Sequence, residues 1–354
     1  MVNIWRRSAL GLTLLLAATI FVLTVSRADI QDFAVLSFYW LLLAASWNLL
    51  AGFGGQFSFA HLALALSGGY FSVFCERMFD TSPLLTLPLA GISTALIGFG
   101  LGLVSLRVRG VYLSLITFGF AGAFSVWATA DWERTSGYAG LNSDIFFTGT
   151  DSRPFLLLGL ALVTLYFTSQ SQLLVSGFGL QAMAVRDREA VAEGLGVRTA
   201  RVKVAMFTYT AFWAGVAGSY YAGYVGTVSP SVGQLIWMGW VVTMVVVGGL
   251  GTSFGPIAGV LLVRFLDFLI RSMGSEYETV MVASLLVIFM FLVPNGLVGL
   301  AESARTRLHG PRRRWPDSLE PLAHSSTAAV ANSPAVPPAS ADESSTAGPM
   351  DKGS

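Results

Sequence analysis

Two long uncharged runs enclose one short charged stretch in the middle of the chain. Residues 154–185 and 204–263 contain no Asp, Glu, Lys or Arg, whereas residues 186–203 between them are rich in charge. Only 12% of the chain is charged and 54% is hydrophobic, while an ordinary soluble domain is roughly a quarter charged. A run of about 20 apolar residues crosses a bilayer core as a helix. The pattern therefore predicts membrane-spanning helices, with residues 186–203 as a loop on one aqueous side.

Further uncharged runs recur along the chain and predict an all-α, polytopic membrane protein with about ten transmembrane helices. We expect these helices at residues 8–26, 33–52, 57–75, 84–106, 110–130, 154–172, 204–225, 234–250, 255–271 and 279–298. The first run has an alternative interpretation as a signal peptide, because Ser26-Arg27-Ala28 resembles a small-residue cleavage site. Its length and the spans behind it favour a transmembrane helix.

The composition changes after the last predicted span. Residues 301–354 are charged and then rich in Ser, Pro and Ala. Such a segment cannot bury enough apolar surface to offset the entropy cost of ordering. We therefore predict a transmembrane domain over residues 1–300 and a disordered cytoplasmic tail over residues 301–354.

The basic residues of the loops predict the orientation, because cytoplasmic loops carry an excess of Lys and Arg. With both termini in the cytoplasm, the cytoplasmic loops hold Arg6, Arg7, Arg107, Arg109, Arg186, Arg188, Arg198, Arg201 and Lys203. The opposite loops hold Arg27, Arg77, Arg134, Arg153 and Arg271. The charged loop of residues 186–203 is therefore expected in the cytoplasm.

The composition also argues against several functions. The formal net charge is only +1, whereas nucleic-acid binding needs clustered basic residues on a folded surface. Cys75 is the single cysteine and the chain has three histidines, so we expect no metal site. The sequence lacks a Gly-x-x-x-x-Gly-Lys-Ser/Thr phosphate loop, so we expect no nucleotide or other cofactor bound to this chain. The predicted spans show no cluster with acid–base or metal-ligand spacing, which argues against a membrane enzyme.

Two glycine-rich segments interrupt the apolar runs. The first break, residues 52–59, reads GFGGQFSF, and the second break, residues 248–255, reads GGLGTSFG. Paired interruptions in two halves of a transporter point to a binding or gating region. The alternative is two tight turns that use glycine for positive φ. The candidate gating glycines are Gly52, Gly55, Gly248, Gly249 and Gly251.

Uncharged polar residues lie beside the first break, namely Asn48, Gln56, Ser58 and His61. Such side chains suit a path for a small zwitterion or amide. They offer hydrogen bonds without a buried charge, which costs at least ~2.5 kcal/mol at the bilayer centre. The alternative interpretation is hydrogen bonding between helices.

Arg264 and Asp267 lie three residues apart in the ninth predicted span. Charges within a span usually pair with each other. The sequence leaves two placements open: a pair near the outer end of the helix, or a structural or gating contact inside the bundle. An ion-coupled carrier usually needs ionisable groups in its spans, and this pair is the candidate for that alternative.

Five segments of the chain match one family in order and spacing. Residues 48–61 read NLLAGFGGQFSFAH, which is similar to Asn-Leu-x-x-Gly-x-x-Gly-Gln-x-Ser-x-Gly-His with Ala60 in place of the usual glycine. The other four segments are residues 107–112, 179–203, 248–256 and 294–297, with Asn295 in place of an arginine. In these segments the chain resembles the membrane-spanning permease subunits of branched-chain amino-acid ATP-binding-cassette (ABC) importers. The likeness covers nearly all of residues 30–300.

The resemblance implies a permease that carries Leu, Ile, Val or a similar small polar solute across the bacterial inner membrane. It implies four partners: two cytoplasmic ABC ATPase subunits, a second permease subunit of a different chain and an extracytoplasmic solute-binding protein. The coupling loop for the ATPases would contain Arg186, Arg188, Glu189, Ala192, Gly196, Arg201 and Lys203. Tyr112 and Thr117 would join the polar residues of the first break in the translocation path.

Within the charged loop, we expect residues 189–193 to form a short helix that ends at Gly194 and Gly196. Ala190 and Ala192 would keep this helix slim enough to enter a groove on the ATPase, and the basic residues would pair with acidic groups there. One departure concerns the substrate, because residues 135–141 read TSGYAGL where the family commonly has TGGPNGL. A permease for urea or short amides is therefore an alternative, as is an ion-coupled secondary carrier.

Overall fold

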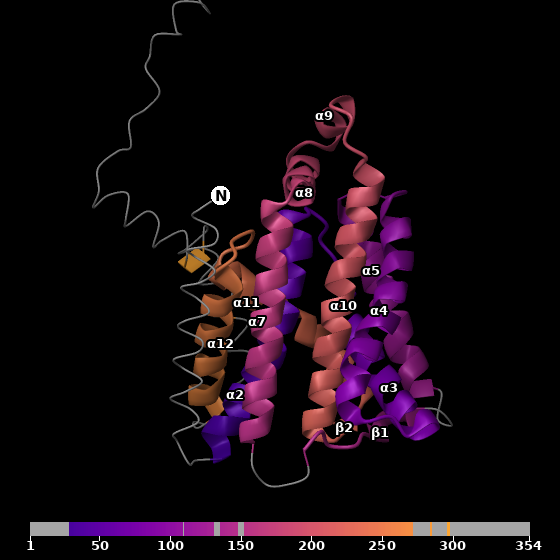
Figure 1. The fold of residues 1–354 in the computed structure, drawn as a ribbon, viewed down its shortest axis with the longest axis vertical. Coiled ribbons are helices and arrows are strands. Elements are labelled where there is room, and N and C mark those ends of the chain that lie inside the picture. The colour runs from indigo at the N-terminus through magenta and orange to yellow at the C-terminus, as the bar shows by residue number, and fades with distance from the viewer. Residues whose placement is uncertain are drawn as a thin grey trace, which may run out of the picture. The chain divides into compact units, whose positions relative to one another are not determined.

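The computed structural model describes residues 28–108, 110–130, 135–147 and 152–271, together with Ser284 and Gly296–Leu297. These residues form a bundle of long helices (Figure 1). The helices are α2 (Ala28–Asn48), α3 (His61–Phe79), α4 (Pro83–Ser105), α5 (Val111–Ala130), α7 (Arg153–Val175), α8 (Gly177–Asp187), α9 (Glu189–Gly194), α10 (Thr199–Val225), α11 (Leu235–Gly248) and α12 (Gly255–Arg271). The shorter elements are the π-helical turn η1 (Leu49–Phe53), the 3-10 turns η2 (Gly137–Ala139) and η3 (Pro230–Gly233), and the antiparallel strands β1 (Leu141–Asn142) and β2 (Thr227–Val228).

The all-α prediction is confirmed, and eight predicted spans each correspond to one observed helix. Four stretches are long and apolar enough to cross a membrane by length and composition, namely Asp29–Phe53, Pro83–Ser105, Val111–Ala130 and Arg153–Val175. Helix α10 carries Arg201 and Lys203 in its first turns, and Ile236–Gly248 is apolar but shorter. The predicted span at 8–26, nearly all of the span at 279–298 and the tail at 301–354 lie outside the described residues. The count of ten spans therefore stays a prediction.

Helix α10 lies at the centre of the bundle and packs against α2, α3, α4 and α7. Its close approach to α3 depends on residues without side chains. A Cβ atom on Gly68 would lie 2.5 Å from the Gly215 Cα, and one on Gly218 would overlap the Ala65 carbonyl oxygen. Small residues at such positions let helix backbones come into direct contact, which is the main source of packing energy between helices in a membrane.

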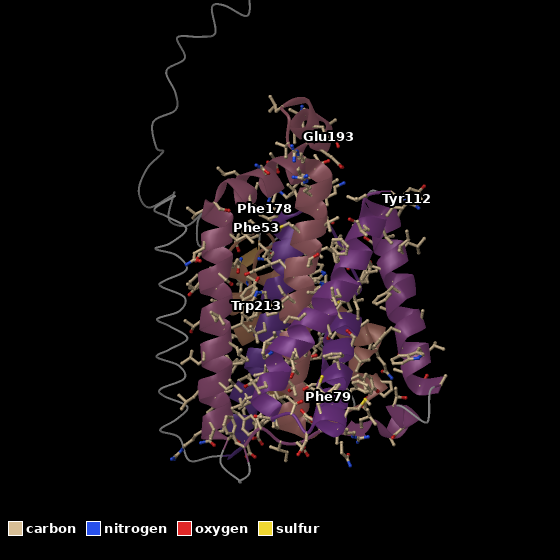
Figure 2. The ribbon with its side chains drawn as sticks, turned by 45° about the vertical axis from the view of Figure 1, so that its right-hand side comes forward. Phe53, Phe79, Tyr112, Phe178, Glu193 and Trp213 are labelled. Carbon is tan, nitrogen blue, oxygen red and sulfur yellow. The ribbon has the colours of Figure 1, made fainter. Side chains whose placement is uncertain are left out.

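Large aromatic side chains fill the bundle around α10, and two of the buried tyrosines hydrogen-bond to backbone carbonyls. The Tyr166 hydroxyl donates to the Ala45 carbonyl at 2.7 Å, and the Tyr220 hydroxyl donates to the Phe155 carbonyl at 3.0 Å. Trp213 lies inside the bundle, as Figure 2 shows, with its ring edge-on to Tyr166. Tyr166 and Tyr220 therefore add apolar contact without an unsatisfied hydroxyl, whereas the buried hydroxyls of Tyr39 and Tyr70 have no hydrogen-bond partner among the described residues.

Helices α4 and α5 present many apolar side chains to the outside of the bundle. Leu96, Val111 and Leu115 are all more than half exposed, and Gly100, Gly119 and Gly122 have open space where a Cβ would be. A contiguous apolar surface of this kind is typical of contact with lipid or with a second membrane chain.

The loop of residues 135–147 lies at the end of the bundle opposite α9 (Figure 1). It is held by Glu76, whose buried carboxylate accepts hydrogen bonds from the Ser143 hydroxyl and the Asp144 N–H, both at 3.0 Å. Arg77 donates to the Asn142 carbonyl at 3.1 Å. These bonds fix the loop directly to the end of α3.

Arg264 and Asp267 form an ion pair at 2.5 Å, and both side chains are buried. The guanidinium carbon of Arg264 lies 5.1 Å from the centre of the Phe33 ring, so the pair sits where α12 packs on α2. Of the two placements that the sequence left open, the structure supports the contact inside the bundle.

The contact between α3 and α10 yields a stability prediction. The substitution Gly218→Ala should destabilise the protein by about 1–3 kcal/mol, because the added methyl group meets backbone that cannot move independently. Thermal unfolding of the detergent-purified protein measures this effect. The matched control is Gly119→Ala, since nothing lies within 4 Å of that position. Equal unfolding temperatures for the two variants would contradict the packing argument.

Candidate functional site

The first break begins inside a helix. Helix α2 runs into the wider π-helical turn η1, and α3 begins only at His61. The backbone between them is satisfied by side chains of neighbouring elements. Trp47 donates to the Ser58 carbonyl at 2.7 Å, Ser114 donates to the Phe57 carbonyl at 3.0 Å, and Thr117 accepts from the Phe59 N–H at 3.0 Å. Non-helical backbone persists at membrane depth only with partners of this kind.

The second break separates α11 from α12. Gly249 and Gly251 adopt φ values of 120° and 73°, which L-residues with side chains rarely adopt. The Thr252 hydroxyl oxygen accepts from the Gly255 N–H at 3.0 Å and so caps the start of α12. Positive φ therefore explains the choice of glycine at positions 249 and 251, and a role of the paired breaks in binding or gating stays a prediction.

The two breaks lie against each other, joined by the side chain of Asn48. Its Oδ1 accepts a hydrogen bond from the Gly251 N–H at 2.8 Å, and its Nδ2 donates to the Thr252 carbonyl at 2.9 Å. Gly52 allows this approach, because a Cβ there would lie 2.5 Å from the Gly251 nitrogen. A Cβ on Gly296 would lie 2.5 Å from the Gly249 Cα, so Gly296 packs against the second break.

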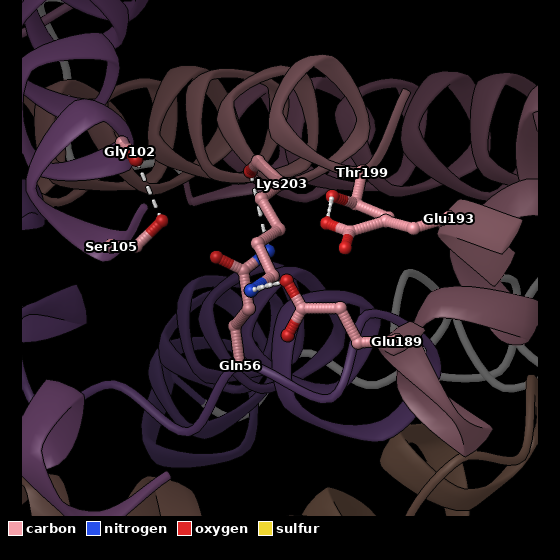
Figure 3. Close-up of polar contacts among 7 residues, drawn as sticks. All are labelled: Gln56, Gly102, Ser105, Glu189, Glu193, Thr199 and Lys203. Atoms are coloured by element: carbon pink, nitrogen blue, oxygen red, sulfur yellow. Dashed lines mark hydrogen bonds and ion pairs between the residues drawn. The ribbon is translucent and has the colours of Figure 1, made fainter. Parts of the chain in front are cut away.

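The charged loop is folded back on itself by internal polar contacts (Figure 3). Lys203 pairs with Glu189 at 2.5 Å, and the Thr199 hydroxyl donates to the Glu193 carboxylate at 2.7 Å. Gln56 of the first break donates to the Lys203 carbonyl at 3.2 Å. Helix α9 lies at the top of Figure 1. Residues 188–203, which these contacts hold together, are called the braced elbow below.

Two expectations about the elbow are changed by these contacts. Lys203 was expected to face an acidic partner, but it is buried and paired with Glu189 within the chain. Ala192 was expected to slim an inserted helix, but it is 1% exposed and packs inward. The exposed apolar residues are instead Val191 at 53% and Leu195 at 80%. The sequence did not point to Val191 and Leu195, because the contact surface was assigned to the small residues Ala190 and Ala192.

A groove of about 500 Å³ runs beside Leu195. It is lined by Phe178, Gln181, Leu195, Gly196, Val197, Arg198, Arg201 and Val202. Arg188, Arg198 and Arg201 are exposed around the elbow. The surface of the elbow thus combines exposed apolar side chains, Val191 and Leu195, with arginines around them.

Most of the candidate path residues come together. Asn48, Ser58, His61 and Thr117 are fully buried around the first break, and Gln56 is nearly so. Tyr112 does not join them, because it is 71% exposed at the end of α5 (Figure 2). Within the described part of the chain, both ring nitrogens of His61 and the Oε1 of Gln56 have no hydrogen-bond partner.

Three residues of this site were not singled out from the sequence. Trp47 is adjacent to Asn48, Ser114 lies three residues before Thr117, and Thr252 follows Gly251. Residues three apart on a helix lie on the same face, so the choice of Thr117 as a path residue also points to Ser114. In the described ranges, no group of three or more His, Cys, Asp and Glu residues could hold a metal ion.

The chain is similar to known membrane-transport proteins. The family model "Branched-chain amino acid transport system / permease component" matches residues 30–293. The high-affinity branched-chain amino acid transport system permease protein LivM of Salmonella typhimurium is 29% identical over 315 residues, which cover 81% of this chain and 74% of that protein. LivH of Escherichia coli is 29% identical over 128 residues, 36% of this chain and 41% of that protein. The autoinducer 2 import system permease protein LsrC of Klebsiella pneumoniae is 28% identical over 175 residues, 48% of this chain and 49% of that protein. No solved structure gives a significant match.

The bridge between the two breaks generates a second prediction. Asn48→Leu keeps the side-chain size but leaves the Gly251 N–H and the Thr252 carbonyl without their partner. Each unsatisfied buried group costs about 1–3 kcal/mol, so we expect a loss of at least that size in thermal unfolding. The same change at the exposed Asn142 is the control and should have little effect. An unchanged stability of the Asn48 variant would show that the bridge is dispensable.

Proposed function

Because the chain belongs to the family of permease components of branched-chain amino acid transport systems, we propose that it conducts branched-chain amino acids across the bacterial inner membrane. In this proposal the chain is a subunit of an ABC importer. Two cytoplasmic ABC ATPases supply the energy, and the charged loop 186–203 faces the cytoplasm.

The observation that carries this proposal is the braced elbow. It stands clear of the helix bundle and is stiffened by the Lys203–Glu189 and Thr199–Glu193 contacts. At its tip it exposes Val191 and Leu195, and Arg198 and Arg201 line the adjacent groove. Protein–protein interfaces are commonly organised around a few buried apolar anchors surrounded by a polar rim. We propose that an ATPase receives the two apolar residues in a pocket flanked by acidic groups.

The proposed substrate follows from the family and from the polar groups at the first break. A cavity of about 160 Å³ next to that break is lined by Gln56 and Ser105 and also by the charged residues Arg186, Glu189 and Lys203. Beside it, the buried side chains of Asn48, Ser58 and Thr117 carry no charge. Such groups can hydrogen-bond a small zwitterion without the cost of a buried charge. The similarity to LivM extends over 81% of this chain, whereas the similarity to LsrC extends over 48%. From the similarity to LivM we propose Leu, Ile and Val as the substrates, with urea or short amides as the alternative.

The remaining partners are proposed from the surfaces that they would cover. LivM and LivH carry separate permease names, and this chain is similar to both. We propose a second permease of a different chain as its partner, seated in part on the apolar faces of α4 and α5. A solute-binding protein would dock on the opposite side of the membrane from the elbow, at the loop of residues 135–147.

The test is uptake by the complete complex in proteoliposomes. With two ATPases, a second permease and the binding protein present, labelled leucine uptake should require ATP. Excess isoleucine or valine should compete, and urea should not. Uptake that persists without ATP and collapses with an ion gradient would instead establish a secondary carrier. ATP-dependent uptake of labelled urea, with none of leucine, would establish the amide alternative.

The docking surface yields a separate prediction. The double substitution Val191→Asp and Leu195→Asp should reduce co-purification of the ATPases by about tenfold or more. Burying two charges in an apolar pocket costs several kcal/mol, and about 1.4 kcal/mol corresponds to each tenfold change. The control is Phe79→Asp, an equally exposed apolar residue at the other end of the bundle. Normal recovery of the ATPases with the double variant would exclude the elbow tip as the anchor.

A further inference from the structure

We propose that Arg186 is a positioning residue that couples the charged loop mechanically to both glycine-rich breaks, with Asn48 as the second part of the link. This inference rests on the proposed function and goes beyond it. It assigns the transmission of motion to two named side chains. Neither side chain would serve as an anchor for the ATPase in this view.

The link starts at a carbonyl that the first break leaves without a helical partner. In η1 the Gly54 N–H bonds to the Leu49 carbonyl and the Gln56 N–H bonds to the Leu50 carbonyl. The Gly52 carbonyl accepts instead from Arg186 Nη1 at 2.8 Å. Carbonyls at the end of a helix carry partial negative charge, so a guanidinium is favoured there. The bond is charge-assisted and therefore stronger than a neutral one.

The guanidinium is held in place by its sequence neighbour. Asp187 Oδ1 accepts from Arg186 Nε at 2.9 Å and lies 2.8 Å from Nη2. These contacts occupy one edge of the planar guanidinium and leave Nη1 directed at Gly52. Arg186 is thus oriented by the loop and bonded to the break, although from the sequence it was expected to pair with a partner protein.

Close backbone packing makes this link stiff. Gly55 has a φ of 68°, and a Cβ on it would lie 2.7 Å from the Arg186 Cγ. On the other side of the first break, the Gly52 backbone contacts the Gly251 backbone with no side chain between them. The end of α8, the first break and the second break therefore form three successive layers. Layers packed at this density displace one another when one of them moves.

Asn48 holds the first and second breaks together with two hydrogen bonds. Its amide accepts from Gly251 and donates to Thr252, so the second break can neither withdraw from the first nor slide along it without breaking a bond. Gly296 also packs on Gly249 of the second break. A displacement of the elbow can thus reach α2, α11 and α12 through a continuous set of bonded groups.

The deciding measurement is the number of leucine molecules transported per ATP hydrolysed by the complete complex. Arg186→Met removes the guanidinium and keeps an unbranched side chain. We expect ATPase binding and ATP hydrolysis within about twofold of the parent and a transport-to-hydrolysis ratio about tenfold lower, as expected for one charge-assisted bond. Arg186→Lys should recover part of the ratio, because an ammonium can still donate to the Gly52 carbonyl. Arg107→Met, an exposed arginine in the turn between α4 and α5, should leave the ratio unchanged.

A second measurement tests the link without transport. In amide hydrogen exchange of the purified complex, Arg186→Met should increase exchange in residues 52–56 and also in residues 249–255. Faster exchange confined to the first break would overturn the proposal, as would hydrolysis and uptake that fall in equal proportion. If the parent complex shows no ATP-dependent uptake while both breaks still respond, the proposed function fails and the mechanical link stands.

Discussion

The amide of Asn48 makes the rest of this architecture possible. The helical backbone is interrupted at two places in an apolar bundle, and each interruption leaves backbone groups without helical partners, several of them buried or half-buried. An unsatisfied peptide group in such surroundings costs several kcal/mol. One asparagine satisfies a donor and an acceptor of the second break at once. A hydroxyl could not span both groups, and a carboxylate could only accept, which explains the choice of residue at this position.

The glycines follow from the same constraint. For Asn48 to reach the second break, the two backbones must touch, and Gly52 and Gly251 are the positions where they do. Gly251 also needs its positive φ to present its N–H to the amide. Glycine is therefore required for contact between the two breaks and also for the turns within them. This explains why both breaks resemble each other although 203 residues separate Asn48 from Gly251.

Sequence reasoning predicted the features that depend on local composition. Uncharged runs located eight helices, and glycine clusters located both breaks. It did not predict which breaks would meet, because hydrogen bonds between distant residues leave no local pattern. It also misplaced Ala192 and Lys203, because alternation of charged and small residues does not reveal which side of a short helix packs inward. Tyr112 and Thr117 were both expected in the translocation path, but Tyr112 faces outward and Thr117 is buried, because residues five apart on a helix point in different directions.

At both ends of the bundle, a charged side chain bonded to backbone joins a connecting segment to a helix. At one end the Glu76 carboxylate accepts from the Asp144 N–H of the loop, and at the other Arg186 donates to the Gly52 carbonyl of a helix end. The signs are those that the electrostatics of free N–H and C=O groups require. Neither loop is therefore a loose connection between spans. Each loop is bonded directly to a helix that is distant from it in the sequence. A force applied to either loop therefore acts first on that helix.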